Sequence, residues 1–186
     1  MDCGFGTNSY RIRAMAAQSE QASHCFAFEQ DFIGTWRCIP LCVRRKLDLI
    51  GLKLKLSHWL ALEQPQRQEL VQWGDSTAAL DALREHLLQC TRSMADGEAK
   101  PLPQASEEPW QRADGLPLEL ANAAELAGHE LNGQRWEQLS ELERFALCKL
   151  ARPGHDHHNL PAAFSELLGP ASGATDPTDH APAQEA

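Results

Sequence analysis

Long apolar runs and basic residues are both scarce in this sequence. The stretch 47–60 is interrupted by Asp48, Lys53, Lys55 and His58, so it does not reach the roughly 18 uncharged apolar residues of a membrane span. Lys and Arg number 17 against 26 Asp and Glu, which gives a formal net charge of -9. A chain this acidic lacks the attraction to phosphate on which nucleic-acid binding depends. We expect neither a membrane-spanning protein nor a nucleic-acid partner.

The N-terminus also lacks the continuous apolar segment of a secretory signal, which favours a cytoplasmic location. In that compartment thiols stay reduced, and a chain of 186 residues needs no covalent staples. We therefore predict free thiols at all six cysteines. They are Cys3, Cys25, Cys38, Cys42, Cys90 and Cys148.

Catalytic motifs are missing as well. The sequence has no glycine-rich phosphate loop ahead of a helix, no nucleophile elbow and no C-x-x-C motif. Six cysteines and eight histidines make any single Cys–His pairing uninformative. The residues alone therefore specify no catalytic set, and we expect no cofactor.

Aromatic residues make up only 6% of the chain, but 42% of it is hydrophobic, which is enough for a core. Residues 1–24 and 169–186 show no apolar period, and we expect both ends to be disordered. The stretch 97–115 is rich in proline and resembles a linker. We predict one helical domain over 25–168, made of two halves that this linker joins.

An internal repeat supports the two halves. Shifting the sequence by 77 residues aligns eight identical residues within 31 positions, including two tryptophans and two glycines. The aligned pairs are Pro40/Pro117, Leu49/Leu126, Gly51/Gly128, Leu54/Leu131, Trp59/Trp136, Leu62/Leu139, Arg67/Arg144 and Leu70/Leu147. We therefore predict two similar helical repeats, at about 40–73 and 117–150.

The pattern in each repeat predicts a helix, then a short helix, then a further helix. The prolines suit a helix start, and the glycines eleven residues later suit a left-handed C-terminal cap. Ser57 and Asn132 can cap the short helices, and Ser140 with Glu143 forms a capping box. Further helices are expected after 75–77 and after Asn159. The alternation in 52–56 is short enough to be an extended connection, so the predicted fold class is all-α.

The repeated tryptophans and arginines are interpreted structurally. Trp59 and Trp136 are expected in the core of each repeat. Arg67 and Arg144 could each pair with a carboxylate between the halves. Neither pair points to a ligand site.

The densest polar cluster is 152–159. Its His155 and His158 could join Cys38 and Cys42 in a Cys2His2 metal site, which would make the chain a metal-binding or metal-delivery protein, the alternative function that we consider. Alternatively, the cluster is a hydrophilic connection without a functional site, in which Asn159 caps the next helix. A third reading is a partner or anion site built from Arg152 and the two histidines.

Positive charge gathers in residues 37–67, where seven Lys and Arg face two Asp and Glu, a local charge of +5 in an acidic chain. Such an asymmetry is typical of a docking face for an acidic partner. A solvated face that acidic helices balance explains it equally well.

Several runs resemble the nitrate reductase-associated protein family over roughly 26–168. Two differences from the family pattern, Gly154 in place of Ser and Asp156 in place of Glu, do not obviously remove a function. The runs that carry the resemblance are 26–32 (FAFEQDF), 36–40 (WRCIP), 43–54 (VRRKLDLIGLKL), 144–147 (RFAL), 149–150 (KL) and 152–159 (RPGHDHHN), together with Trp136 and Leu139.

This resemblance implies a small accessory protein of nitrate assimilation that is not an enzyme. Nitrate reductase is the expected partner, through direct or indirect contact. A helical body with a basic region and a polar His loop could hold a reductase subunit while its cofactor is installed. The expected contact residues are Arg37, Arg44, Arg45, Arg152, His155, His158 and Asn159.

Overall fold

The structure is a computed structural model that describes residues 22–152 and 159–171. Within them the chain is mostly helical, as predicted, and none of the described helices is long and apolar enough to cross a lipid bilayer. The predicted disordered ends lie largely outside the described residues. The described helices are η1 (Ala27–Glu29), α2 (Gln30–Ile33), α3 (Leu41–Leu49), α4 (Leu56–Ala61), α5 (Gln64–Gln72), α6 (Thr77–Thr91), η2 (Pro109–Gln111), α7 (Leu118–Leu126), α8 (Gly133–Gln138), α9 (Glu141–Leu150) and α10 (Leu160–Leu168), where η marks a 3-10 helix.

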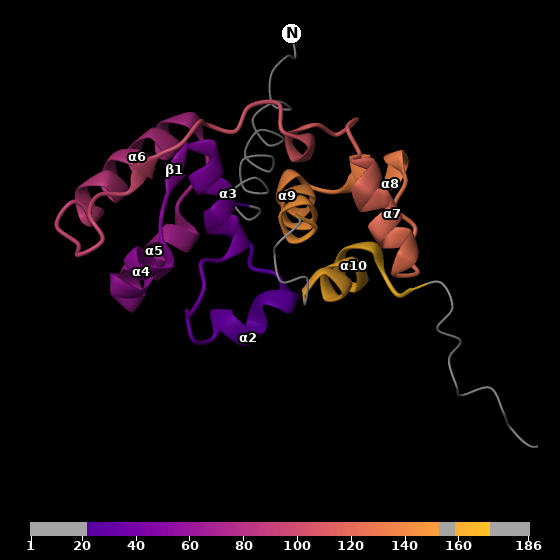
Figure 1. Cartoon of the computed structure of the whole chain (residues 1–186), viewed down its shortest axis with the longest axis horizontal. Helices are drawn as coiled ribbons and strands as arrows, with labels where there is room; N and C mark the ends of the chain where they lie inside the picture. The colour runs from indigo at the N-terminus through magenta and orange to yellow at the C-terminus, as the bar shows by residue number, and fades with distance from the viewer. Residues whose placement is uncertain (1–21, 153–158, 172–186) are drawn as a thin grey trace, which may run out of the picture.

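Helices α3 and α9 lie side by side in the middle of the molecule (Figure 1). Helices α4, α5 and α6 lie on one side of this pair, and α7 and α8 lie on the other. Helix α10 packs against α9 and also against η1, near the start of the described chain. One hydrophobic cluster runs from Phe26 to Leu167 and so includes residues of both sides.

A two-stranded sheet departs from the all-α prediction. Strand β1 (Leu52–Lys53) pairs antiparallel with β2 (Lys100–Pro101), with Leu52 opposite Pro101. The sequence analysis treated 52–56 as an unpaired connection, which is wrong for β1. The partner strand comes from nearly fifty residues away, so the local pattern could not reveal it.

Three tryptophans are fully buried, and the repeated pair has matching surroundings. Trp59 Nε1 donates to the Trp36 carbonyl at 2.8 Å, and Trp136 Nε1 donates to the Arg112 carbonyl at 2.9 Å. The guanidinium of Arg67 lies 5.9 Å from the Trp59 ring centroid. The guanidinium of Arg144 likewise lies 5.9 Å from the ring centroid of Trp136. The core position expected for both tryptophans is confirmed.

The two repeated arginines bind backbone carbonyls rather than a carboxylate between the halves. Arg67 donates to the carbonyl of Leu62, and Arg144 donates to that of Leu139. Each carbonyl ends the short helix of the same segment, so the arginine satisfies a group that the helix leaves unpaired. The expected carboxylate partners are not found among the hydrogen bonds of the described residues.

Helix bounds recur along the chain at the predicted interval. Helices α7, α8 and α9 each begin 77 residues after α3, α4 and α5, respectively. Gly51 and Gly128, which follow the first helix of each segment, have φ angles of 61° and 80°. That the segments 40–73 and 117–150 are copies of one unit stays a prediction, which these local features support.

Most of the predicted helix caps are present. The Ser140 and Glu143 side chains exchange hydrogen bonds with each other's backbone N–H, and Asn132 accepts from the Arg135 N–H at 2.9 Å. The cap predicted at Ser57 is wrong, because α4 begins at Leu56 and Ser57 lies inside its first turn.

The predicted linker packs closely against the first half before it reaches the second. The Leu102 N–H donates to the Gly51 carbonyl at 2.9 Å, and the Ala105 N–H donates to the Asp48 carbonyl at 2.9 Å. Farther along, Trp110 in η2 is buried, and its ring centroid lies 5.1 Å from that of Phe145 on α9. The stretch 97–115 therefore contributes to the packing of both sides.

Gly51→Ala should lower the free energy of unfolding by about 2 kcal/mol or more. A Cβ there would overlap the Leu102 carbonyl oxygen, and a φ of +61° is itself strained for alanine. Gly97→Ala is the matched control, since φ is +74° but no atom lies within 4 Å of the added Cβ. Urea denaturation should show a loss of about 1 kcal/mol for the control. Equal losses in the two variants would contradict the close approach of Leu102.

Candidate partner-binding residues and a polar pocket

Arg37 and Arg44, two of the predicted contact residues, lie at the entrance of α3. Arg37 is exposed in the loop after α2, and its guanidinium donates to Thr35 Oγ1 at 3.1 Å and to the Asp31 carbonyl at 3.2 Å. Arg44 is half-buried on α3 and donates to the Ile39 carbonyl at 2.9 Å. Each guanidinium uses only part of its five N–H donors in these bonds.

Arg45, the next residue on α3, has a different environment. Its side chain is buried, with Nη1 lying 3.0 Å from Asp75 Oδ2 and Nη2 lying 2.7 Å from Glu141 Oε1. Glu141 is the first residue of α9, so this arginine joins α3 to α9. The contacts of Arg45 are therefore internal to the protein.

Lys46 is fully buried despite its charge. Its Nζ donates to the carbonyls of Leu70, Val71 and Trp73 at 3.0, 2.9 and 2.6 Å, at the end of α5. These are carbonyls that a helix C-terminus leaves unpaired, and a cation is favoured there. Burial lowers the pKa of Lys46 to about 8, from its ordinary 10.5.

Other cations of the 37–67 region also have partners inside the protein. Lys55 Nζ lies 3.1 Å from Asp96 Oδ1, and Arg67 donates to three backbone carbonyls. Much of the local charge surplus seen in the sequence is thus used within the fold. Among the predicted contact residues of this region, Arg37 and Arg44 remain at least partly exposed.

The second cluster of predicted contact residues is only partly described. Arg152 is exposed just after α9, and Asn159 is half-buried at the start of α10. Asn159 occupies the N-cap position of α10, as predicted, but its side chain makes no capping hydrogen bond. His155 and His158 lie outside the described residues. No hydrogen bond among the described residues joins this cluster to Arg37 or Arg44.

Only the two cysteines of the alternative Cys2His2 metal site, Cys38 and Cys42, lie among the described residues. Cys38 is half-buried, but Cys42 is fully buried on α3 and its sulfur faces Cys25, at 3.9 Å. Within 22–152 and 159–171, no group of three or more His, Cys, Asp and Glu could hold a metal ion. The two histidines of the predicted set fall outside those ranges.

A buried carboxylate, that of Glu29 in η1, lies close to the Cys25–Cys42 pair. Glu29 is fully buried, and its carboxylate accepts hydrogen bonds from the Leu41 N–H at 2.9 Å and the Phe26 N–H at 3.2 Å. Burial raises the pKa of Glu29 from its ordinary 4.5 to about 7. The first turn of α3 is thus held by a group that changes its charge near neutral pH.

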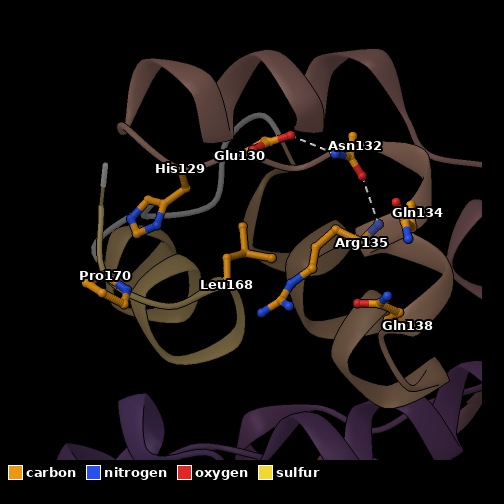
Figure 2. A pocket seen from close by; sticks show the side chains of 8 residues that line it. All are labelled: His129, Glu130, Asn132, Gln134, Arg135, Gln138, Leu168 and Pro170. Carbon is orange, nitrogen blue, oxygen red and sulfur yellow. Dashed lines mark hydrogen bonds between the residues drawn. The ribbon is translucent and has the colours of Figure 1, made fainter. Parts of the chain in front are cut away.

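A polar pocket of about 410 Å³ opens between α8, the connection that precedes it and α10 (Figure 2). The Arg135 side chain reaches toward α10, where it donates to the Leu167 carbonyl at 3.3 Å. His129 is only 7% exposed, and its Nδ1 has no hydrogen-bond partner among the described residues. The lining residues are His129, Glu130, Asn132, Gln134, Arg135, Gln138, Leu168 and Pro170.

The lining of this pocket is rich in amide and guanidinium groups and poor in apolar side chains. Such a surface suits polar groups of a partner better than an apolar small molecule, whose sites are mostly hydrophobic. Two leucines of the neighbouring helix α7 are strongly exposed, Leu118 at 72% and Leu126 at 90%. A second hollow along α7 shares His129 and Glu130 with the first.

The sequence analysis missed Cys25 and Glu29 as members of a buried cluster with Cys42. Glu29 lies in a run quoted for its family resemblance, but nothing in its spacing marks it as buried. The polar pocket was also missed. Its walls come from residues 129–138 and 168–170, which only the folded chain brings together.

The model of one protein family, described as conserved nitrate reductase-associated protein, matches residues 25–167. The chain belongs to this family. The resemblance found in the sequence is thereby confirmed. The match to the nitrate reductase-associated family spans α3, α9 and the described contact residues. No curated protein and no solved structure matches the chain.

Arg45→Ala should lower the free energy of unfolding by about 1–3 kcal/mol. The substitution leaves Asp75 and Glu141, both largely shielded from solvent, without their shared cation. Arg92→Ala is the control, because the Arg92–Glu98 pair is exposed and should contribute at most about 1 kcal/mol. Chemical denaturation of both variants checks this. A loss for Arg45→Ala no larger than that for Arg92→Ala would contradict an internal role of Arg45.

Glu29 should make stability fall as the pH rises from about 4.5 to 7. Its folded-state pKa is raised, so over this window the folded protein binds more protons than the unfolded chain. Above pH 7 the folded state holds a buried charge that costs stability. Denaturation midpoints measured from pH 4.5 to 8 should show wild type losing stability relative to Glu29→Gln. A difference independent of pH would show that the carboxyl group does not titrate in this window.

Proposed function

We propose that this protein is an accessory factor of assimilatory nitrate reductase that acts in the cytoplasm by binding a protein partner rather than by catalysis. The observation that carries the proposal is the family match, which covers residues 25–167 and thus nearly all of the described fold. The description of the family states an association with nitrate reductase. We propose that the association is a contact that supports assembly or maturation of the reductase.

The placement of the unusual titratable groups supports a binding role. Glu29, Cys42 and Lys46 have strongly displaced pKa values, and all three lie in the interior beside α3. They do not line the polar pocket. A catalytic site usually combines displaced pKa values with a cleft that admits substrate. In this protein these displaced pKa values and the polar pocket are in different parts of the molecule.

The proposed contact residues are those at the entrance of α3 and around the end of α9. Arg37, Arg44 and Arg152 are at least partly exposed cations, and they suit an acidic patch on the partner. The proposal extends to His155, His158 and Asn159, which continue the chain after Arg152. Arg45 acts differently: it holds α3 against α9 and so supports the neighbouring contact residues.

We further propose that residues 40–73 and 117–150 are two copies of one helical module and that together they make a single domain over 25–168. The equal spacing of three helices supports this, as do the matched Trp–Arg contacts. A module of this size cannot bury its helices alone, which explains why the copies pack together. Neither copy is then expected to fold separately.

Replacing Arg37, Arg44 and Arg152 by Ala together should weaken capture of nitrate reductase by at least about tenfold, because desolvated charge pairs at an interface contribute strongly to affinity. A pull-down from lysate of the native host, with the reductase quantified by activity and by immunoblot, measures this. The matched control replaces Arg84, Arg92 and Arg112, which removes the same charge elsewhere.

The results distinguish whether the protein binds nitrate reductase from whether these arginines form the contact. If the wild-type chain captures no reductase, direct binding is wrong. If wild type and both triple variants capture it equally, the binding stands but these three arginines are not its contacts. A second variant with His155 and His158 replaced tests the remainder of the predicted surface.

A further inference from the structure

Two cysteines that are far apart in the sequence meet beside the buried carboxylate. Cys25 lies just before η1 and Cys42 lies in the first turn of α3, and their sulfur atoms are 3.9 Å apart. Cys25 is half-buried, whereas Cys42 is fully buried. The pair therefore joins a half-buried cysteine to a fully buried one.

This geometry lies close to that of a disulfide. A disulfide places its sulfurs about 2.05 Å apart, so the two sulfur atoms need to approach by about 2 Å. Closing this gap requires a change of side-chain rotamer at Cys25, the less buried of the two residues. No similar sulfur neighbour is found for Cys38, Cys90 or Cys148 among the described residues.

The surroundings assign different roles to the two sulfurs. The hydrogen bond from the Cys42 thiol lowers the pKa of Cys25, and the Lys46 ammonium acts in the same direction, against burial and the charge of Glu29. The same hydrogen bond raises the pKa of Cys42, with burial adding to the effect. The direction of these shifts favours Cys25 over Cys42 as the sulfur that reacts first.

We propose that Cys25 and Cys42 form a reversible disulfide by exchange with a small-molecule disulfide of the glutathione type. This modification site is independent of the proposed role in nitrate assimilation. It also agrees with the free thiols expected in a reducing compartment, where protein disulfides are usually transient.

The exchange occurs in two balanced steps. The Cys25 thiolate attacks one sulfur of glutathione disulfide, so that a mixed disulfide forms and one glutathione thiolate leaves. Cys42 then loses its proton to water or to the departing thiolate, and its sulfur attacks Cys25 Sγ and expels the second glutathione. Two protein thiols and one glutathione disulfide give one protein disulfide and two glutathione thiols.

The first step makes the second one easier. Once Cys25 carries glutathione, its hydrogen bond to Cys42 and its negative charge no longer raise the pKa of Cys42, although burial still does. Lys46 remains nearby and favours the Cys42 thiolate. The completed bond would tie the start of η1 to α3. That turn already donates two N–H groups to Glu166 on α10, at 2.9 Å each, so oxidation would link α3, η1 and α10.

Peptide mapping of the full chain tests the proposal. The reduced protein is incubated with glutathione disulfide, its free thiols are blocked with N-ethylmaleimide, and it is digested with trypsin. Cleavage after Arg13, Arg37 and Arg44 places Cys25 in peptide 14–37 and both Cys38 and Cys42 in peptide 38–44. The expected product is a linked pair of these two peptides that added reduced glutathione separates.

Single variants assign the sulfurs. Cys38→Ser should still form the linked pair, and Cys42→Ser should stop at one glutathione on Cys25. Cys25→Ser should lose the link, while Cys90→Ser is a neutral control. Circular dichroism checks that each variant is folded. In wild type alone, the mixed disulfide on Cys25 should appear before the linked pair, which keeps the test valid if a variant unfolds.

Three results would overturn the proposal: no linked pair in wild type, a linked pair that persists in Cys42→Ser, or a link that forms only after the protein is denatured. The second result would assign the bond to Cys38. The third would show that the folded protein holds the two sulfurs apart.

Discussion

The contact between α3 and α9 holds the two sides of this protein together, and the other features depend on it. Arg45 of α3 bridges Asp75 and the first residue of α9, and Lys149 near the end of α9 lies 2.6 Å from Asp48 of α3. These charged side chains are largely shielded from solvent, so separating the two helices would leave each charge without its partner, which costs free energy. The pair of helices carries Arg37 and Arg44 around the start of α3 and Arg152 just after the end of α9.

Features that depend on short stretches of chain could be predicted from the sequence. The glycine after α3, the capping box at Ser140 and the tryptophan core positions follow from local backbone chemistry or from the repeat. The roles of Arg44 and Arg45 could not be separated, because adjacent helix residues point about 100° apart and only the packing of α9 decides which one is buried. The β1–β2 pair and the Cys25–Cys42 contact likewise need the folded chain, since each joins distant residues.

The buried polar groups give this small protein much of its internal order. Lys46 closes the end of α5, Glu29 holds the start of α3, and Arg144 binds a carbonyl beside Trp136. Each pairs with backbone groups that would otherwise be unsatisfied. These buried charges are used internally, whereas Arg37, Arg44 and Arg152 are at least partly exposed.

The sharpest test of the proposed accessory role is to delete the gene and to measure nitrate reductase activity and nitrate reductase protein separately. We expect that nitrate reductase activity per cell is lower in the deletion strain grown on nitrate and that it recovers when the wild-type gene is restored. The ratio of activity to reductase protein then identifies whether assembly or maturation is affected. Reduced activity at unchanged protein level indicates maturation, and loss of the protein indicates assembly or stability. Unchanged activity and unchanged protein in the deletion strain would contradict the account.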